Sequence, residues 1–328
     1  MSQNNKGRGF KILKQDAING GVMGVIIGDA LGLPVQFMTK TEIRKNPITD
    51  MTGGGAFGLE PGAWSDDSSL TLCLAESLYE VGYNPADIAR RFVEWYRDGY
   101  MTPLGESFDI GGTTAIAMKR LIHGVAPFKA GPTDAESNGN GSLMRILPAT
   151  LFFAHESDYT MIQRICEVSK ITHGHPRSQL ACSLYSLFVK ELLRGSSPQK
   201  AYDTMRLKSQ TVFFVNPKIG KQLRHFKRII SGELPNLPES EIKSGGYVVE
   251  SLEAALWSFL TTSSFKDAVL KAVNLGWDTD TVGAITGSMA GVYYGFSNIP
   301  AQWLSKLLDY EKVLSLTNRF AERVLQTK

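Results

Sequence analysis

The chain has 328 residues, of which 43% are hydrophobic and 20% are charged. A chain of this length can bury a large core, and the composition is that of a soluble globular protein. The formal net charge is only +3 at pH 7 and no basic stripe is present, which speaks against a nucleic-acid partner.

The chain divides into a short polar beginning and one long globular part. Residues 1–15 are rich in Asn, Lys and Gly and predict a flexible N-terminal arm, followed by a single compact helical domain over residues 16–328. The longest apolar segment, residues 20–35, carries Asp29 and is read as too short and too interrupted to span a bilayer. Without a signal-peptide pattern or paired cysteines, we expect a cytoplasmic protein with no membrane partner.

Helical periodicity dominates the domain. Leu70, Leu74 and Leu78 form one apolar stripe, which predicts a helix that ends before Gly82. Asn84-Pro85 then predicts the start of another helix. Similar patterns predict helices over residues 112–123, 142–155, 158–171, 177–193, 246–260, 265–274, 281–294 and 300–325. The one short β-branched run, at 210–215, does not justify a sheet, so the expected fold class is all-α.

Two apolar helical segments carry glycines at spacings of mostly three and four residues. The first contains Gly20, Gly21, Gly24, Gly28 and Gly32, and the second contains Gly283, Gly287, Gly291 and Gly295. A glycine inside a helix costs roughly 1 kcal/mol relative to alanine. We therefore predict that both helices are central and approach their neighbours closely.

Two acidic segments each precede a predicted helix. They are Ser65-Asp66-Asp67-Ser68 and Asp278-Thr279-Asp280-Thr281. Serine and aspartate are common helix caps, so two unrelated surface caps are one interpretation. Four converging carboxylates would otherwise repel one another. The other interpretation is therefore a site for two Mg²⁺ or Mn²⁺ ions, which prefer carboxylate and hydroxyl oxygens as ligands. Two such ions about 3.5–4 Å from each other can activate a water molecule between them.

Two further motifs have both a structural and a functional interpretation. The Gly/Asn-rich run from Asn138 to Arg145 leads into a predicted helix, where exposed amides would suit a phosphate or diphosphate. A long turn with a serine cap fits these residues equally well. Thr172-His173-Gly174-His175-Pro176 joins two predicted helices as a rigid polar corner, which is either a helix cap or a substrate contact.

These motifs together resemble the ADP-ribosylglycohydrolase family, the group that contains the dinitrogenase reductase-activating glycohydrolase. The resemblance covers residues 16–325 and rests on five motifs in order. They are Gly28-Asp29-Ala30-Leu31-Gly32, Trp64-Ser65-Asp66-Asp67-Ser68, Asn138-Gly139-Asn140-Gly141-Ser142-Leu143-Met144-Arg145, Thr172-His173-Gly174-His175-Pro176 and Gly276-Trp277-Asp278-Thr279-Asp280-Thr281. It implies a single orthogonal helical domain and a hydrolase that frees ADP-ribose from protein side chains.

The resemblance also assigns roles to individual residues. Two divalent ions, Mg²⁺ or Mn²⁺, would be held by Ser65, Asp66, Asp67, Asp278, Asp280 and Thr281. Substrate would be bound by Asn138, Gly139, Asn140, Gly141, Ser142, Met144, His173 and His175. The catalytic set would be Asp67, Asp280, Asp109 and Gln36, with Asp109 beside the departing side chain.

One departure from the family opens an alternative function. Gln36 stands where the family usually has glutamate, and a glutamine can neither accept a proton nor carry charge. The main hypothesis is hydrolysis of ADP-ribosylated protein, with arginine as the favoured linkage. The alternatives are a weakly active relative that acts as an immunity protein against an ADP-ribosyltransferase toxin through residues 1–15, and a hydrolase of a small ADP-ribose-like metabolite.

Overall fold

The structure, a computed structural model, describes residues 4–327, and helices joined by loops are its main elements. Apart from two isolated bridges, these residues form no strand, so the predicted all-α class is confirmed. The α-helices are α1 (Asn4–Gly32), α2 (Lys40–Ile43), α3 (Asp66–Glu80), α4 (Pro85–Asp98), α5 (Gly112–Ile122), α6 (Pro127–Ala130), α7 (Leu147–Phe153), α8 (Asp158–Lys170), α9 (Pro176–Leu193), α10 (Pro198–Lys208), α11 (Thr211–Val215), α12 (Pro217–Gly220), α13 (Lys227–Ser231), α14 (Val248–Leu260), α15 (Phe265–Val273), α16 (Thr279–Tyr294), α17 (Ala301–Leu304) and α18 (Tyr310–Gln326). Short 3-10 turns are η1 (Leu33–Val35), η2 (Lys221–His225), η3 (Leu234–Asn236), η4 (Glu239–Glu241) and η5 (Phe296–Asn298).

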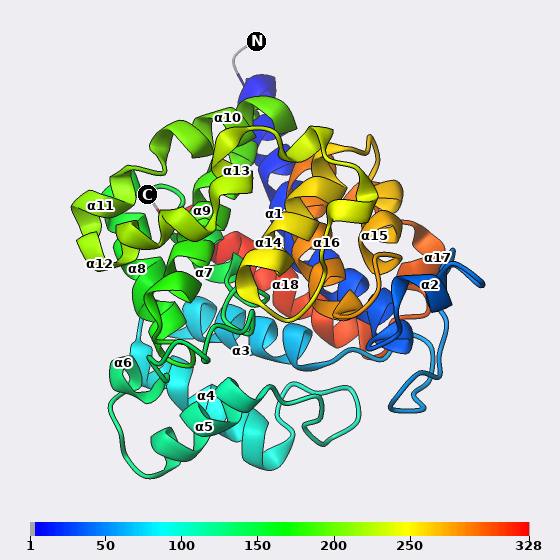
Figure 1. The fold of residues 1–328 in the computed structure, drawn as a ribbon, viewed down its shortest axis with the longest axis horizontal. Helices are drawn as coiled ribbons and strands as arrows, with labels where there is room; N and C mark the ends of the chain where they lie inside the picture. Colours follow the sequence, from blue (N-terminus) through cyan, green and yellow to red (C-terminus); the bar gives the residue numbers. More distant parts are fainter. Residues whose placement is uncertain (1–3, 328) are drawn as a thin grey trace.

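The centre of the molecule is the antiparallel contact between α1 and α16 (Figure 1). A Cβ atom added to Gly24 would lie 2.1 Å from the carbonyl oxygen of Gly287, and one added to Gly28 would lie 2.1 Å from that of Gly283. The same backbone approach continues towards both ends of the contact. The prediction of two central, closely packed glycine helices is therefore confirmed, and the two pack against each other.

The apolar character of α1 follows from this central position. Gln15–Val35 is long and apolar enough to cross a membrane, which corrects the expectation that the segment is too short. However, 94% of its most apolar window is buried inside the protein. The core of the fold therefore accounts for the composition of this helix.

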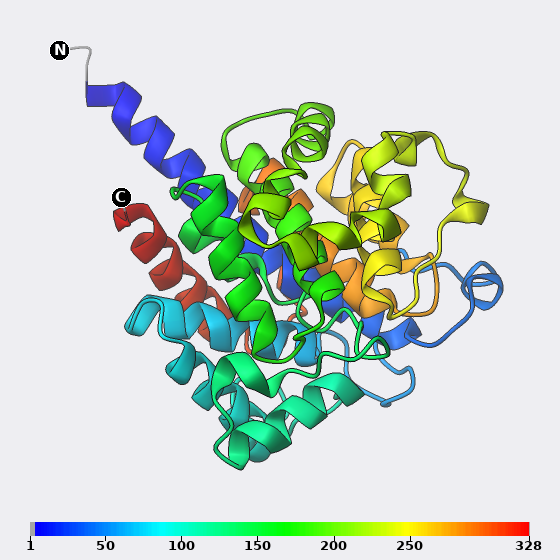
Figure 2. The ribbon, with the colours of Figure 1, turned by 60° about the vertical axis from the view of Figure 1, so that its left-hand side comes forward.

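The predicted N-terminal arm overlaps the first helix. α1 begins at Asn4, so residues 4–15 continue the backbone conformation of the core helix, and its first turns extend beyond the neighbouring helices (Figure 2). Residues 1–3 lie outside the described residues. Whether the arm is flexible and whether it touches a toxin stay predictions.

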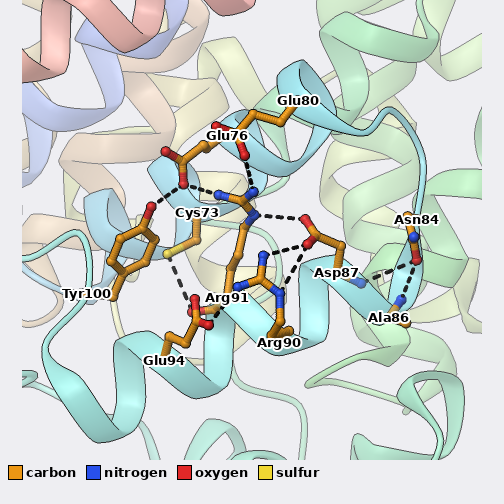
Figure 3. Close-up of polar contacts among 10 residues, drawn as sticks. All are labelled: Cys73, Glu76, Glu80, Asn84, Ala86, Asp87, Arg90, Arg91, Glu94 and Tyr100. Atoms are coloured by element: carbon orange, nitrogen blue, oxygen red, sulfur yellow. Dashed lines mark hydrogen bonds and ion pairs between the residues drawn. The ribbon is translucent and has the colours of Figure 1, made fainter.

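A buried arginine clamps α4 onto α3. Arg91 is 5% exposed, and its guanidinium pairs with Glu76 and Glu80 of α3 and, at 2.8 Å, with Asp87 of its own helix (Figure 3). Tyr100 also donates a hydrogen bond to Glu76. A buried charge must be paired to be tolerated, so this cluster fixes the orientation of α3, whose N-terminus carries the first acidic segment.

Most predicted helices occur at their expected positions, and two differ. The predicted helix 300–325 is split into α17 and α18 because the chain turns at Asp309, whose φ is +53°. At this turn the amide of Leu308 donates to the carbonyl of Gly62 at 3.1 Å. The predicted helix 142–155 is shorter and begins only at Leu147, because Pro148 fits the first turn of a helix and would break a helix that continued through it from residue 142.

The central contact makes a direct prediction. Gly24→Ala should lower the free energy of unfolding by about 2 kcal/mol or more, because overpacking against the backbone of α16 outweighs the roughly 1 kcal/mol gain in helix propensity. Thermal unfolding measures this effect. Gly112→Ala is the control, because a Cβ there meets nothing within 4 Å, and its Tm should stay close to that of the wild type. Equal stability of the two variants would contradict the prediction.

Candidate active site

Both acidic segments form first turns of helices. α3 begins at Asp66, with Ser65 as its N-cap. α16 begins at Thr279, with Asp278 at the N-cap position. The helix predicted over residues 281–294 therefore begins two residues earlier than expected, and Thr281 lies inside its first turn. Carboxylates are favoured here, since helix N-termini carry partial positive charge and unpaired amide groups.

A buried carboxylate of α1 holds the first acidic turn in place. Asp29 accepts hydrogen bonds from the backbone amides of Ser65 at 2.9 Å and Ser68 at 3.1 Å, and from the Ser68 hydroxyl at 2.5 Å. Burial raises the pKa of Asp29 to about 6, and these hydrogen bonds oppose the rise. Asp29 thus ties the N-terminus of α3 to the glycine-packed helix.

The two acidic turns meet in the interior. The hydroxyl of Thr281 donates to Oδ2 of Asp67 at 3.3 Å across the two helices. Burial first, and the charges of neighbouring carboxylates second, raise the pKa values of Asp66, Asp67 and Asp280 well above the usual range. Within residues 4–327 none of these acids forms an ion pair. The interpretation of two unrelated surface caps is thereby excluded.

A cavity of about 460 Å³ opens above this acidic centre. The predicted site residues that line it are Gln36, Asp66, Asp109, Gly139, Asn140, Gly141, Met144, His173, Asp278 and Thr281. Ser65, Asp67 and Asp280 do not line it and are 1%, 1% and 0% exposed. The cavity wall contains no lysine or arginine among the described residues.

The Gly/Asn-rich run forms one wall of the cavity as a chain of turns. Asn140 donates its side-chain amide to Oδ2 of Asp278 at 2.5 Å and to Ser251 at 2.9 Å. The hydroxyl of Ser142 lies in the core, where it accepts from Ser169 at 2.9 Å. Arg145 is also fully buried, and its guanidinium stacks on the ring of Phe92.

Of the two histidines at the corner before α9, only His173 lines the cavity. Burial and the nearby charge of Arg145 lower the pKa of His173 to about 3, so its ring is neutral at physiological pH. Nδ1 of His175 instead accepts the amide hydrogen of Arg177 and caps α9. Asn138 lies outside the cavity wall as well, with its amide group donated to the carbonyl of Ala135.

Gln36 and Asp109 form a pair at the cavity wall. Nε2 of Gln36 donates to Oδ2 of Asp109 at 2.8 Å. A glutamine can donate this bond, whereas an ionised glutamate in its place would face a second carboxylate. Oε1 of Gln36 is buried and has no hydrogen-bond partner among the described residues. The glutamine that replaces the usual glutamate at position 36 therefore holds the Asp109 carboxylate through a hydrogen bond.

The site includes residues that the sequence did not single out. Phe37 and Trp277 line the cavity mouth with φ values of +68° and +65°. Left-handed backbone at a bulky residue costs of order 1–3 kcal/mol and is often found at functional sites. In the sequence, Asp29 was identified only as part of a motif. An aspartate inside an apolar helix is nevertheless a usable signal, because a buried carboxylate must accept hydrogen bonds from neighbouring donor groups.

The oxygen atoms of the two acidic segments fit divalent cations, but the acidic side chains do not all converge on one ion. Oδ1 of Asp67 and Oδ2 of Asp280 are buried without a hydrogen-bond partner among the described residues, and both are hard oxygen ligands. No three acidic, histidine or cysteine side chains within residues 4–327 converge on one point as a ready metal site. Two ions would therefore divide the acids and complete their coordination with hydroxyls, carbonyls or water.

The helical fold and this acidic cavity define a family. The family model described as ADP-ribosylglycohydrolase matches residues 11–328. The chain belongs to the ADP-ribosylglycohydrolase family, which confirms the resemblance that its motifs indicated, and it is a hydrolase of that type.

Individual relatives share most of the chain. It is 37% identical over 306 residues to the ADP-ribosylarginine hydrolase Tri1 of Serratia proteamaculans, covering 93% of this chain and 78% of the relative. It is 32% identical to the ADP-ribosyl-dinitrogen reductase glycohydrolase of Rhodospirillum rubrum, covering 89% and 90%. A solved structure described as an ADP-ribosylglycohydrolase-related protein complex superposes with a TM-score of 0.79 at 31% identity, covering 95% and 99%.

The uncompensated acids predict an unusual pH dependence. A carboxyl whose pKa is raised on folding favours the folded state at low pH, and that contribution is lost as pH rises through the folded pKa. In EDTA, Asp67→Asn should therefore gain stability over the wild type with rising pH, reaching about 1–2 kcal/mol, or 2–4 °C in Tm, by pH 8. Thermal unfolding from pH 5 to 9 tests this. A lower Tm for the variant at every pH would contradict it.

His173 predicts a pH effect of opposite sign. Its pKa falls from 6.5 to about 3 on folding. Below pH 6.5 the ring therefore binds a proton in the unfolded chain but not in the folded protein, which lowers the free energy of unfolding. On going from pH 7 to pH 5, the wild type should lose about 2 kcal/mol more than His173→Asn. Urea unfolding at both pH values measures the difference. Parallel losses in the two proteins would show that the ring protonates freely in the folded state.

Proposed function

We propose that this protein hydrolyses the N-glycosidic bond between ADP-ribose and an arginine side chain of a modified protein. The observation that carries the proposal is the chemistry of the cavity wall, where Asp109 lies outside the proposed metal ligands and the wall's described residues include no lysine or arginine. Such a wall suits a cationic guanidinium. The name of the Serratia relative, an ADP-ribosylarginine hydrolase, supports the same linkage.

Backbone amides can bind the diphosphate of the substrate in the absence of cationic side chains. Gly139 and Gly141 line the cavity, and among the described residues their amides have no backbone acceptor. A Cβ at Gly141 would lie 2.8 Å from the ring of His173, so only glycine leaves this backbone open. We infer that these two amides contact the diphosphate, which is anionic and accepts several hydrogen bonds.

Two Mg²⁺ or Mn²⁺ ions are proposed to bind at the paired helix N-termini. Their ligands would be Ser65, Asp66, Asp67, Asp278, Asp280 and Thr281. The partnerless carboxylate oxygens of Asp67 and Asp280 support this donor set. When bound, such ions lower the pKa of water and polarise ligand oxygens. Asn140 orients Asp278 through its 2.5 Å hydrogen bond.

Asp109 is proposed to bind the departing arginine. Gln36 holds one carboxylate oxygen of Asp109, and the carboxylate lines the cavity. It can form an ion pair with the guanidinium, which leaves when water adds to the anomeric carbon and the carbon–nitrogen bond breaks. The departing nitrogen takes up a proton that comes from the water, so arginine leaves as a cation that Asp109 stabilises.

The test is release of ADP-ribose from arginine-ADP-ribosylated protein with Mg²⁺, with Mn²⁺ and with EDTA. Asp280→Asn should lower kcat at least about 100-fold, and EDTA should abolish turnover by the wild type. Glu322→Gln, a change to an exposed acid of α18, is the matched control and should keep full activity. Serine-linked ADP-ribose should be released much more slowly. Turnover that survives both EDTA and Asp280→Asn would contradict the proposed metal site, and no release from arginine would contradict the linkage.

A further inference from the structure

Exposed aromatic side chains gather at the mouth of the cavity. Phe37 is 58% exposed, Trp277 is 54% exposed and Phe57 is 36% exposed. The ring of Phe57 lies between its neighbours, 6.5 Å from Phe37 and 5.3 Å from Phe108, measured between ring centroids. We call Phe37, Phe57, Phe108 and Trp277 the aromatic rim. Soluble proteins rarely expose large apolar side chains as a group unless they contact a partner.

The backbone presents two members of the rim as a rigid pair. The amide of Phe37 donates to the carbonyl of Trp277 at 2.7 Å, and the amide of Trp277 donates to the carbonyl of Met38 at 2.7 Å. Both aromatic residues have left-handed φ values, a strained conformation for a bulky side chain. Core packing does not account for this strain, because both side chains are more than half exposed. The strained backbone instead holds these two rings on the surface, at the cavity mouth.

The rim is continuous with the residues that face the departing group. Phe108 directly precedes Asp109, and Phe37 directly follows Gln36. Two contacts join these segments. One is the Gln36–Asp109 hydrogen bond of 2.8 Å, and the other is the ring of Phe57, which lies close to the rings of both Phe37 and Phe108. The aromatic rim therefore lies next to the two residues that face the departing group.

We propose that the aromatic rim binds the protein segment around the modified arginine, through apolar side chains that flank this arginine. This inference rests on the proposed arginine linkage. ADP-ribose would occupy the cavity and the guanidinium would meet Asp109, so the flanking residues lie outside the mouth, where the rings are. Aromatic rings supply large contact area at low entropic cost. The rim thus recognises protein, and the cavity recognises ADP-ribose.

The experiment compares kcat/KM for arginine-ADP-ribosylated protein with kcat/KM for free ADP-ribosylarginine. Phe57→Ala and Trp277→Gly each remove one ring, and glycine suits the left-handed backbone at position 277. Each variant should lower the ratio of protein to small-molecule kcat/KM about tenfold, mainly through KM for the protein. Phe214→Ala is the matched control. Phe214 is 81% exposed and its helix α11 lies on the opposite side of the molecule from α2 (Figure 1), so its ratio should equal that of the wild type.

A second measurement separates recognition from a general loss of activity. Two ADP-ribosylated peptides that differ only in leucine or aspartate beside the arginine should be distinguished by the wild type, and Phe57→Ala should lose this preference. An unchanged ratio in both variants overturns the proposal, and so does an equal loss on protein and on free ADP-ribosylarginine, because the rings would then contact ADP-ribose itself. Failure of the wild type on both substrates would instead reject the arginine linkage.

Discussion

The glycine contact between α1 and α16 is the constraint on which the site depends. The two helices are antiparallel, so the C-terminal end of α1 meets the N-terminal end of α16, and a Cβ at Gly32 would lie 2.3 Å from the carbonyl oxygen of Thr279. One turn before Gly32, Asp29 reaches the first turn of α3. A backbone contact without side chains thus brings three helix ends within reach of one another, and with them both acidic segments.

The resulting centre concentrates negative charge where water cannot screen it. Helix N-termini offset part of the cost, and the charge of buried Arg145 interacts with that of Asp66. No ion pair completes the compensation within the described part of the chain. Stability and function are therefore opposed at these residues, as is common in sites that bind a charged ligand. The large core around α1 and the Arg91 clamp provide the stability that such a centre requires.

Sequence reasoning identified the elements of this arrangement better than their ends. Glycine spacing identified α1 and α16, because close helix approach leaves no other choice of residue. The acidic segments were identified, yet the helix of the second segment was predicted to begin at Thr281 and begins at Thr279, since first-turn and capping residues have the same composition. Ser142 and His175 share motifs with cavity residues but their side chains lie elsewhere, because a motif does not state which side chains point inward. The aromatic rim left no periodic signal, because its members come from four separate loops.

The regular glycine spacing does not fix how far α1 and α16 are shifted along each other. Because the glycines of this contact recur every four residues, a shift of one helix by about 6 Å would again place glycine opposite glycine over most of its length. Periodic packing therefore does not select the axial position. Polar contacts at the two ends do so. The hydroxyl of Thr279 donates to the carbonyl of Gly32 at 2.8 Å, and Asp16 accepts from the amide and hydroxyl of Ser297 at 3.1 Å each. Two ordinary hydrogen-bonded ends thus determine where the acids of α16 come to rest.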